Sequence, residues 1–280
     1  MLGFLLQHPI CLIILYLVIG FFGSMIVVLI GGGISLITLP FLSMIFYYIF
    51  PANIALKMAI STTIAVMAVL ALMSLITFIR MGFHPDYRYF VILLPFMLIG
   101  SIVGPHITVM LSVTLLHLVI GMLLILLSVY NFFLISFKTQ INEINDFPAM
   151  TCFLMVKNSL AMLVSSILSS TSGTAVGIWL IPRLTKCLPH RKAISTSMFL
   201  GLLNALVGST VYTLHGQHLP IKSNWHLGYI YLPPVIAIAI AAVPGIRIGK
   251  KLIKMFSTVW VKRIFYVYVL ISGIVIIVSP

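Results

Sequence analysis

Long stretches without charge alternate with short polar segments along this chain. The stretches without Asp, Glu, Lys or Arg are residues 1–56, 58–79, 89–137, 158–182, 193–221, 223–246 and 264–280. A membrane-spanning helix needs about 20 consecutive, mostly apolar residues, and the two longest stretches are long enough for two crossings each. The pattern predicts eight spans, at about residues 10–31, 55–79, 88–105, 113–137, 150–170, 193–214, 226–246 and 258–279.

The first charge-free stretch contains one segment whose path through the membrane the pattern does not determine. Between about residues 10 and 50 the chain is apolar almost throughout, and as a straight helix it would measure about 60 Å, twice the hydrocarbon thickness. It must therefore turn back, and we expect the turn at the three glycines 31–33 together with Pro40. Residues 34–50 are then either a re-entrant segment or a further crossing. An odd number of crossings in each half would make the two halves inverted, and an even number would make them parallel.

The chain repeats a motif. Ala-Ile-Ser-Thr occurs at residues 59–62 and again at 193–196, each time after Pro-x-Leu, which begins at Pro40 and at Pro182. Small residues precede each proline: Gly31, Gly32, Gly33 and Ser35 in the first copy, and Ser172, Gly173, Thr174 and Gly177 in the second. A doubled hydrophobic chain with interrupted segments at matching places is typical of transporters built from two repeats.

A second spacing also recurs. Gly100-x-x-x-Gly104 is matched by Gly245-x-x-x-Gly249, a spacing that lets another helix approach closely, and a polar linker at about 136–148 separates the halves. We predict an all-α membrane protein of two four-helix repeats, residues 1–140 and 149–280, with broken or re-entrant helices at the Gly-rich motifs.

Composition excludes a water-soluble domain. The chain is 62% hydrophobic and 7% charged, whereas soluble domains carry about a quarter charged residues. Its N-terminus lacks a basic segment, so we expect a retained first span rather than a signal peptide. Cys11, Cys152 and Cys187 are too few and too far apart for a disulfide framework or a metal motif. No cofactor or ATP-binding pattern is present, and no cofactor is predicted.

Basic side chains predict the orientation. In an eight-span arrangement one side holds Arg80, Arg88, Lys138, Lys157 and Lys222, and the other side holds Lys57, Arg183, Lys186, Arg191, Lys192, Arg247, Lys250, Lys251, Lys254, Lys262 and Arg263. The richer side should be cytoplasmic, which places both termini outside the cytoplasm. The net charge of +13 is then mostly a rim on anionic lipid. Because the basic residues are scattered over short loops, no nucleic-acid partner is expected.

The chemistry available inside the spans favours an anion. No Asp or Glu lies in a predicted span, and a desolvated cation would need one. A Gly-rich break exposes a helix N-terminus, which attracts negative charge, and nearby hydroxyls can donate hydrogen bonds. The first-choice site is Gly31, Gly32, Gly33, Ser35, Ser172, Gly173 and Thr174, and the second layer is Ser61, Thr62, Ser195 and Thr196. The alternative is that the hydroxyls bond one turn back along their own helix and the glycines only pack.

Other polar residues have two interpretations each. Arg183 and Arg247 sit beside repeat motifs, and a guanidinium binds sulfonate or carboxylate oxygens well, although anchoring at the cytoplasmic face also explains both. We keep Arg183 as a candidate. Lys57 and Lys157 are interpreted as snorkelling side chains. Polar links between helices are the favoured interpretation of Asn158 and Asn204, with substrate contact as the alternative. Most of the eight histidines are expected in interfacial loops, with proton coupling as an alternative for any one of them.

These motifs resemble the TauE/SafE family of membrane permeases, the sulfite exporter family. The resemblance rests on Gly31 to Leu42 with Ala59 to Thr63, on Ser172 to Leu184 with Ala193 to Ser197, and on the late Pro244, Gly245 and Gly249. It implies a secondary transporter of small anions, such as sulfite, organosulfonates or related carboxylates, and not an enzyme. It also implies a multi-pass protein of a bacterial inner or plasma membrane. A proton or sodium ion as coupling ion and a homo-oligomer both stay open.

Two other classes of protein remain as alternatives. A membrane assembly or scaffold protein would suit the Gly-x-x-x-Gly spacings. An intramembrane enzyme would need a nucleophile with a base, or a metal with its ligands. The chain contains no His-Glu-x-x-His or Gly-x-Ser-x-Gly sequence and no Asp pair in a span, although Ser or His chemistry stays open. Replacing Gly32 or Gly173 by Val separates the cases, because a scaffold should lose assembly and a carrier should lose flux.

Overall fold

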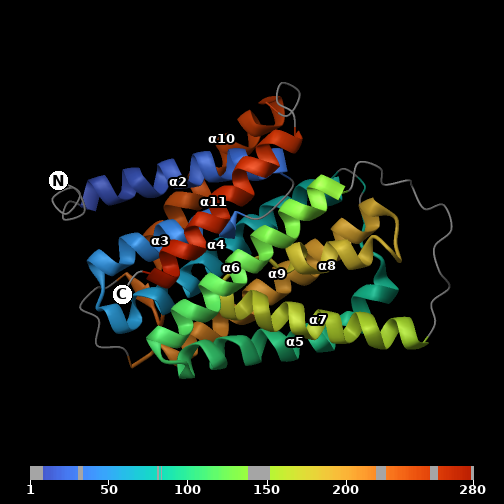
Figure 1. Ribbon diagram of the computed structural model, residues 1–280, viewed down its shortest axis with the longest axis horizontal. Helices are drawn as coiled ribbons and strands as arrows, with labels where there is room; N and C mark the ends of the chain where they lie inside the picture. The colour runs from blue at the N-terminus through green and yellow to red at the C-terminus, as the bar shows by residue number, and fades with distance from the viewer. Residues whose placement is uncertain are drawn as a thin grey trace.

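The protein is an all-α membrane protein, described by a computed structural model. The structure describes residues 9–30, 34–80, 82, 84–137, 152–218, 225–252 and 258–278. Within these residues the first half contains α2 (Pro9–Ile30), α3 (Ser35–Ile49), α4 (Ala52–Arg80), α5 (Tyr87–Met110) and α6 (Val113–Phe137). The second half contains α7 (Cys152–Ser172), α8 (Val176–Leu184), α9 (His190–His215), β1 (His226–Leu227), β2 (Ile230–Tyr231), α10 (Leu232–Leu252) and α11 (Thr258–Val278) (Figure 1).

Each predicted span coincides with a helix over most of its length. Six of the described helices, α4, α5, α6, α7, α9 and α10, are long and apolar enough to cross a membrane, and shorter apolar stretches lie in α2, α3 and α11. One predicted boundary is wrong. Residues 226–231 form a hairpin that precedes α10, with His226 paired to Tyr231 and Leu227 to Ile230. Gly228 has a φ of 58°, which a tight hairpin turn needs and which glycine adopts without strain.

The segment 34–50, which the sequence predicts as either re-entrant or a further crossing, forms the short helix α3. α3 has 15 residues, which corresponds to about 22 Å and is less than the hydrocarbon thickness. α8 occupies the same place in the second half and has only 9 residues. Between α7 and α8 the helix is broken: Gly173 has a φ of 67°, and Thr174 and Ala175 are not helical. Gly31, Gly32 and Gly33 lie outside the described residues.

Two pairs of helices run in the same direction. In α2 and α10, Gly20 lies against Ile238, and Ser24, one turn further on, bonds to the carbonyl of Ala242. In α5 and α7, a Cβ placed on Gly100 would lie 2.6 Å from the Cβ of Ser166, and one placed on Gly104 would lie 2.7 Å from the Cβ of Ser170. Both glycines of the first Gly-x-x-x-Gly motif are therefore used in close packing within the chain, and so is Gly245 of the second, which lies directly against Ser24.

Two other pairs run in opposite directions. In α6 and α11, Gly121 lies against Gly273 and Ile277, whereas Ser128, further along α6, bonds to the carbonyl of Tyr266, further back in α11. In α4 and α9, Ile64 lies against Gly208, whereas Asp86, a few residues beyond the end of α4, bonds to Thr196 near the start of α9. Because α4 and α9 occupy matching places in the two halves, and so do α6 and α11, the matched helices point in opposite directions.

The packing of one half recurs in the other. α2 packs on α10 as α7 packs on α5, and α3 packs on α4 as α8 packs on α9. Figure 1 shows α2 beside α10 and α7 beside α5. The first helix of each half thus packs on the fourth helix of the other half, so the halves interlock rather than form separate domains.

Individual hydrogen bonds follow the same correspondence. The Ser24 hydroxyl lies 3.3 Å from the carbonyl oxygen of Ala242 and 3.1 Å from that of Phe21 in its own helix. The Ser166 hydroxyl lies 2.8 Å from the carbonyl oxygen of Met97, and it also contacts Asn204. These bonds join α2 to α10 and α7 to α5, so they are equivalent in the two halves.

A second equivalent pair involves threonines of the repeated motif. The hydroxyl of Thr62 accepts the N–H of Tyr231, directly before α10, at 3.0 Å. The hydroxyl of Thr196 accepts the N–H of Asp86, directly before α5, at 2.9 Å. Bonds with equivalent positions indicate that the fold itself requires them in both halves.

The basic residues gather at one end of the molecule. α4, α6, α8 and α10 end there, and α5, α7, α9 and α11 begin there (Figure 1). The basic residues of the described chain at this end, here called the basic end, are Arg80, Arg88, Lys157, Arg183, Lys186, Arg191, Lys192, Arg247, Lys250, Lys251, Lys262 and Arg263. Lys57, in the second turn of α4, lies at the opposite end.

The sides expected for several basic residues were therefore wrong. Arg80, Arg88 and Lys157 share the basic end with Arg183, and Lys57 does not. The physical reason is that α3 and α8 each reverse the direction of the chain. An eight-span arrangement that omits them places every residue between α3 and α8 on the wrong side.

Candidate functional site

The break between α7 and α8 is held by a chain of hydrogen bonds. The indole N–H of Trp179 donates to the hydroxyl of Thr174 at 3.2 Å, and this hydroxyl lies 2.9 Å from that of Ser172. The Ser172 hydroxyl donates to the carbonyl of Leu168, one turn back, at 2.6 Å. Each hydroxyl has one proton to donate, so Thr174 donates to Ser172. Both hydroxyls are thus engaged in fixing the shape of the break.

A second polar network joins the break to α9. The side-chain oxygen of Asn204 lies 2.5 Å from the Ser166 hydroxyl and 3.3 Å from that of Ser170, and its amide N–H donates to Ser169 at 3.2 Å. Ser169 in turn donates to the carbonyl of Thr174 at 2.5 Å. All of these residues are buried. Asn204 therefore links α9 to α7, which agrees with the favoured interpretation of this residue as a polar link between helices.

Ser166, Ser169 and Ser170 are not among the residues predicted from the sequence. Their signal is compositional, because residues 165–174 contain seven hydroxyl side chains. The matching segment of α2 and the residues after it, 23–32, contains only Ser24, which corresponds to Ser166. Leu70 of α4 corresponds to Asn204. The network exists in one half only, so the repeated fold does not require it.

The first turn of α8 is partly buried and has no side-chain cap. Ala175 precedes the helix in an extended conformation, and no side chain caps the helix. Thr174 and Val176 are buried. The first N–H groups of a helix have no acceptor within it, and a buried helix end without partners is a place where a ligand can bind.

An unpartnered hydroxyl lies beside this turn. Ser197 of α9 is buried and its hydroxyl has no hydrogen-bond partner in the described structure. It faces Gly177, where an added Cβ would lie 3.2 Å from the Ser197 oxygen. Ser35, in the first turn of α3, is likewise buried without a partner for its hydroxyl within the described ranges. Each short helix therefore begins beside one hydroxyl that has no partner among the described residues.

The second layer of predicted residues connects helices. The Ser61 hydroxyl lies 2.7 Å from the carbonyl oxygen of Tyr229 and 3.0 Å from that of Met58 in its own helix, and its single proton can be donated to either. Thr62 and Thr196 accept the N–H groups that precede α10 and α5, as described above, and Ser195 is buried in α9. These four residues are not part of the lining of either hollow described next.

A hollow of about 580 Å³ opens between α6, α7 and α8 at the basic end. It is lined by Tyr130, Asn131, Lys157, Leu160, Ala161, Val164, Ser165, Leu168, Ile178, Trp179, Pro182 and Arg183. The candidate Arg183 thus lies in a hollow with Lys157, for which the sequence suggests only a snorkelling side chain. Trp179 belongs both to this wall and to the hydrogen-bond chain of the break, so hollow and break share one side chain.

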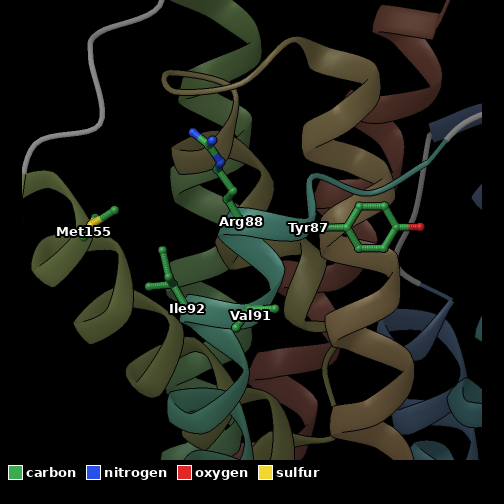
Figure 2. A pocket seen from close by; sticks show the side chains of 5 residues that line it. All are labelled: Tyr87, Arg88, Val91, Ile92 and Met155. Atoms are coloured by element: carbon green, nitrogen blue, oxygen red, sulfur yellow. The ribbon is translucent and has the colours of Figure 1, made fainter.

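A second hollow, of about 560 Å³, lies between α5 and α7. It is lined by Tyr87, Arg88, Val91, Ile92 and Met155, and Figure 2 shows Tyr87 extending to the opposite side of α5 from Met155. Arg88 is its one charged residue, and no residue of the break lines it. We therefore build the candidate site on the break and on the hollow between α6, α7 and α8.

Polar groups at the other end join helices. The Lys57 ammonium group donates to the carbonyl of Val109 at 2.7 Å. His117 is buried in α6, where one ring nitrogen bonds to the carbonyl of Val113 at 2.6 Å and the other to the Tyr47 hydroxyl of α3. His117 lies inside the predicted span 113–137 and is not one of the histidines in an interfacial loop. Within the described residues no group of three His, Cys, Asp or Glu side chains could hold a metal.

Comparison with known proteins gives two matches. Residues 16–276 match the protein family described as Sulfite exporter TauE/SafE. The chain is also similar to a Haemophilus influenzae protein named "Probable membrane transporter protein", with 27% identity over 107 residues. That similarity covers 38% of this chain and 40% of the relative's length. No solved structure matches the chain.

Proposed function

Because the chain belongs to the TauE/SafE sulfite exporter family, we propose that it is a secondary transporter of small anions such as sulfite, organosulfonates or related carboxylates. The observation that carries this proposal is the break between α7 and α8, where a helix N-terminus without a side-chain cap, flanked by the buried Thr174 and Val176, lies beside the Ser197 hydroxyl, which has no partner among the described residues. The partial positive charge of a helix N-terminus stabilises an anion.

The charges of the described residues support an anion over a cation. Asp86 is the acidic residue among them, and its carboxylate caps α5 by accepting the N–H groups of Arg88 at 3.2 Å and Tyr89 at 3.3 Å. A cation crossing the hydrocarbon would need carboxylates within the spans. An anion needs donors, and the break offers backbone N–H groups and a hydroxyl.

The transport unit in this proposal is a pair of inverted repeats, residues 1–140 and 149–280. The equivalent bonds of Ser24 and Ser166, and of Thr62 and Thr196, support it. So do the opposite directions of the matched helices. Inverted repeats supply alternating access, because the two halves can exchange conformations around a site between them.

The basic end faces the cytoplasm in this proposal. The strong excess of Lys and Arg at that end supports it through the positive-inside rule. α2 begins and α11 ends at the opposite end, so both termini are extracytoplasmic. This multi-pass membrane protein then presents its hollow between α6, α7 and α8 to the cytoplasm.

The two alternatives find less support in the structure. Gly100 and Gly104 pack against α7, and Gly245 packs against α2, of the same chain, so these three glycines are not available for assembly with another protein. An enzyme would need a reactive constellation, and the serines at the break are engaged in bonds to carbonyls and to Asn204.

Transport by the purified protein in liposomes tests the proposal. We expect uptake of at least one of sulfite, methanesulfonate and acetate, under imposed proton or sodium gradients, and no uptake of potassium or tetraethylammonium. Gly173→Ala should reduce the uptake at least tenfold, because a side chain at a φ of 67° strains the break by about 1–2 kcal/mol. Gly201→Ala is the matched control, since an added Cβ there meets nothing within 4 Å. Cation uptake without anion uptake would refute the proposed function.

A further inference from the structure

The hollow between α6, α7 and α8 has a polar and an apolar part. Lys157 and Arg183, both exposed, stand at the part nearest the basic end. The apolar lining comes from Leu160, Ala161, Val164, Leu168, Ile178 and Pro182. No acidic side chain of the described chain lines the hollow, so its two cations favour a negatively charged occupant.

The two cations and the tryptophan of the hollow are found in the second half only. By the correspondence of the halves, Lys157 matches Leu15, Arg183 matches Phe41 and Trp179 matches Ile37, and all three matching residues are apolar. Phe41 is stacked on Tyr268 of α11, with ring centroids 6.2 Å apart. The repeated fold therefore forms without cations at these positions, and their presence in one half calls for a function.

We infer that this hollow is the cytoplasmic docking site of the transported anion, with Lys157 and Arg183 binding its charged group and Trp179 contacting its body. This inference rests on the proposed function and adds to it residues, a side of entry and a kind of substrate. The guanidinium of Arg183 binds two oxygens of a sulfonate or carboxylate, and the ammonium of Lys157 adds a point charge.

The size and lining of the hollow favour an organic anion. A volume of about 580 Å³ is in the range of sites for organic ligands, about 300–1,000 Å³. A bare inorganic oxyanion would leave the apolar wall without a partner. An anion with a hydrocarbon body covers that wall and gains the free energy of its burial. We therefore expect butanesulfonate to bind more tightly than sulfite.

Trp179 connects docking to the break. Its ring lines the hollow and its N–H donates to Thr174 at 3.2 Å. An occupant that displaces the indole also removes a bond that fixes the break. Trp179 thus lines the hollow and also positions Thr174 in the break.

Fluorescence of Trp179 measures the docking directly. In a Trp225→Phe, Trp260→Phe background, Trp179 is the remaining tryptophan, and the protein in lipid nanodiscs is titrated with butanesulfonate and with sulfite. We expect a saturable change in emission, with butanesulfonate binding at least tenfold more tightly. Combined Lys157→Gln and Arg183→Gln should weaken butanesulfonate binding at least tenfold. Combined Arg88→Gln and Lys186→Gln removes two exposed cations of the same end that do not line this hollow, and should leave binding unchanged.

The outcomes separate this inference from the proposed function. If the wild-type protein transports anions but the Lys157 and Arg183 variant binds butanesulfonate as tightly as the wild type, the docking site is wrong and the transporter stands. Tighter binding of sulfite than of butanesulfonate overturns the assignment of an organic substrate. A response of Trp179 to phosphatidylglycerol in the nanodisc, but to neither anion, identifies a lipid site and overturns the inference. If liposomes show no anion transport at all, the proposed function itself fails.

Discussion

Ser197 carries a hydroxyl that the fold leaves unused, beside a helix end that lacks a cap. Burying a polar group without a hydrogen bond is unfavourable, so removing it should not destabilise the protein. A bond from this hydroxyl to a bound anion would contribute about 1.5–3 kcal/mol to binding. Stability and affinity therefore respond to its removal in different directions.

We predict that Ser197→Ala keeps or raises the unfolding temperature and weakens anion affinity about tenfold, as the loss of one bond to a charged group implies. Ser209→Ala is the matched control. Ser209 lies further along α9, and its buried hydroxyl oxygen also has no hydrogen-bond partner among the described residues. Thermal unfolding in detergent and concentration-dependent uptake in liposomes measure the two effects. Equal anion affinity in both variants and the wild type would show that Ser197 only packs.

Asn204 is the opposite case, because its amide bonds to three serines of α7. Asn204→Leu introduces the residue type of its counterpart Leu70 and leaves the buried hydroxyls of Ser169 and Ser170 without this partner. We expect a loss of stability of about 1–3 kcal/mol, measured as a lower unfolding temperature. The matched variant Leu70→Ile should have a much smaller effect, because the change conserves volume. An Asn204→Leu variant as stable as the wild type would contradict the role given to the network.

Some of the hydroxyl residues at the break could be predicted from the sequence, and others could not. Ser172, Gly173 and Thr174 were predicted because they interrupt a hydrophobic segment, and the structure places them at the break. Ser169 was not predicted, because a hydroxyl in a membrane helix usually bonds one turn back along its own helix. Its partners are Asn204 of α9 and the carbonyl of Thr174, and one sequence does not reveal which helix packs there.

At the scale of elements, the two threonines of the repeated motif make equivalent contacts. Thr62 holds the N–H before α10, and Thr196 holds the N–H before α5. Each bond connects a helix of one half to the start of a helix in the other half. The two side chains should therefore contribute equally to the interlocked packing.

We predict that Thr62→Val and Thr196→Val each lower the free energy of unfolding by about 1–2 kcal/mol, since each leaves one N–H without its acceptor. The double variant should show the sum, because the two sites are remote from one another and share no partner. Denaturant unfolding in detergent measures the three values. A large effect of one variant together with none of the other would count against equivalent roles.

The short helices explain which elements could be predicted. Eight long apolar segments were recognised by length and composition alone. Whether residues 34–50 cross the membrane or turn back could not be decided, because an apolar helix of 15 residues carries the same signal in either case. α8, with 9 residues, lay below any length criterion for a span. The hairpin at 226–231 was missed because its turn depends on the single residue Gly228.

At the scale of the whole molecule, these two short helices determine the orientation of every other one. The repeated motif predicted two related halves, and the matched hydrogen bonds support that relation. Counting α3 and α8 gives each half five helices in the described structure, an odd number, which is the condition for inverted halves. The same two reversals bring the basic residues of the described helices to one end, apart from Lys57.

Orientation in the membrane follows from that distribution and can be measured at two positions. In a variant without native cysteines, Lys251→Cys places a thiol at the basic end, and Leu227→Cys places one in the hairpin at the opposite end; both native side chains are exposed. We predict that a membrane-impermeant maleimide added to intact cells labels the thiol at position 227 and not the one at position 251, because the end rich in Lys and Arg stays in the cytoplasm. Inside-out vesicles should give the reverse pattern, and detergent-solubilised protein should label at both positions as a control for accessibility. Labelling of both positions from the same side would mean that α10 does not cross the membrane, and the inverted arrangement would then be wrong.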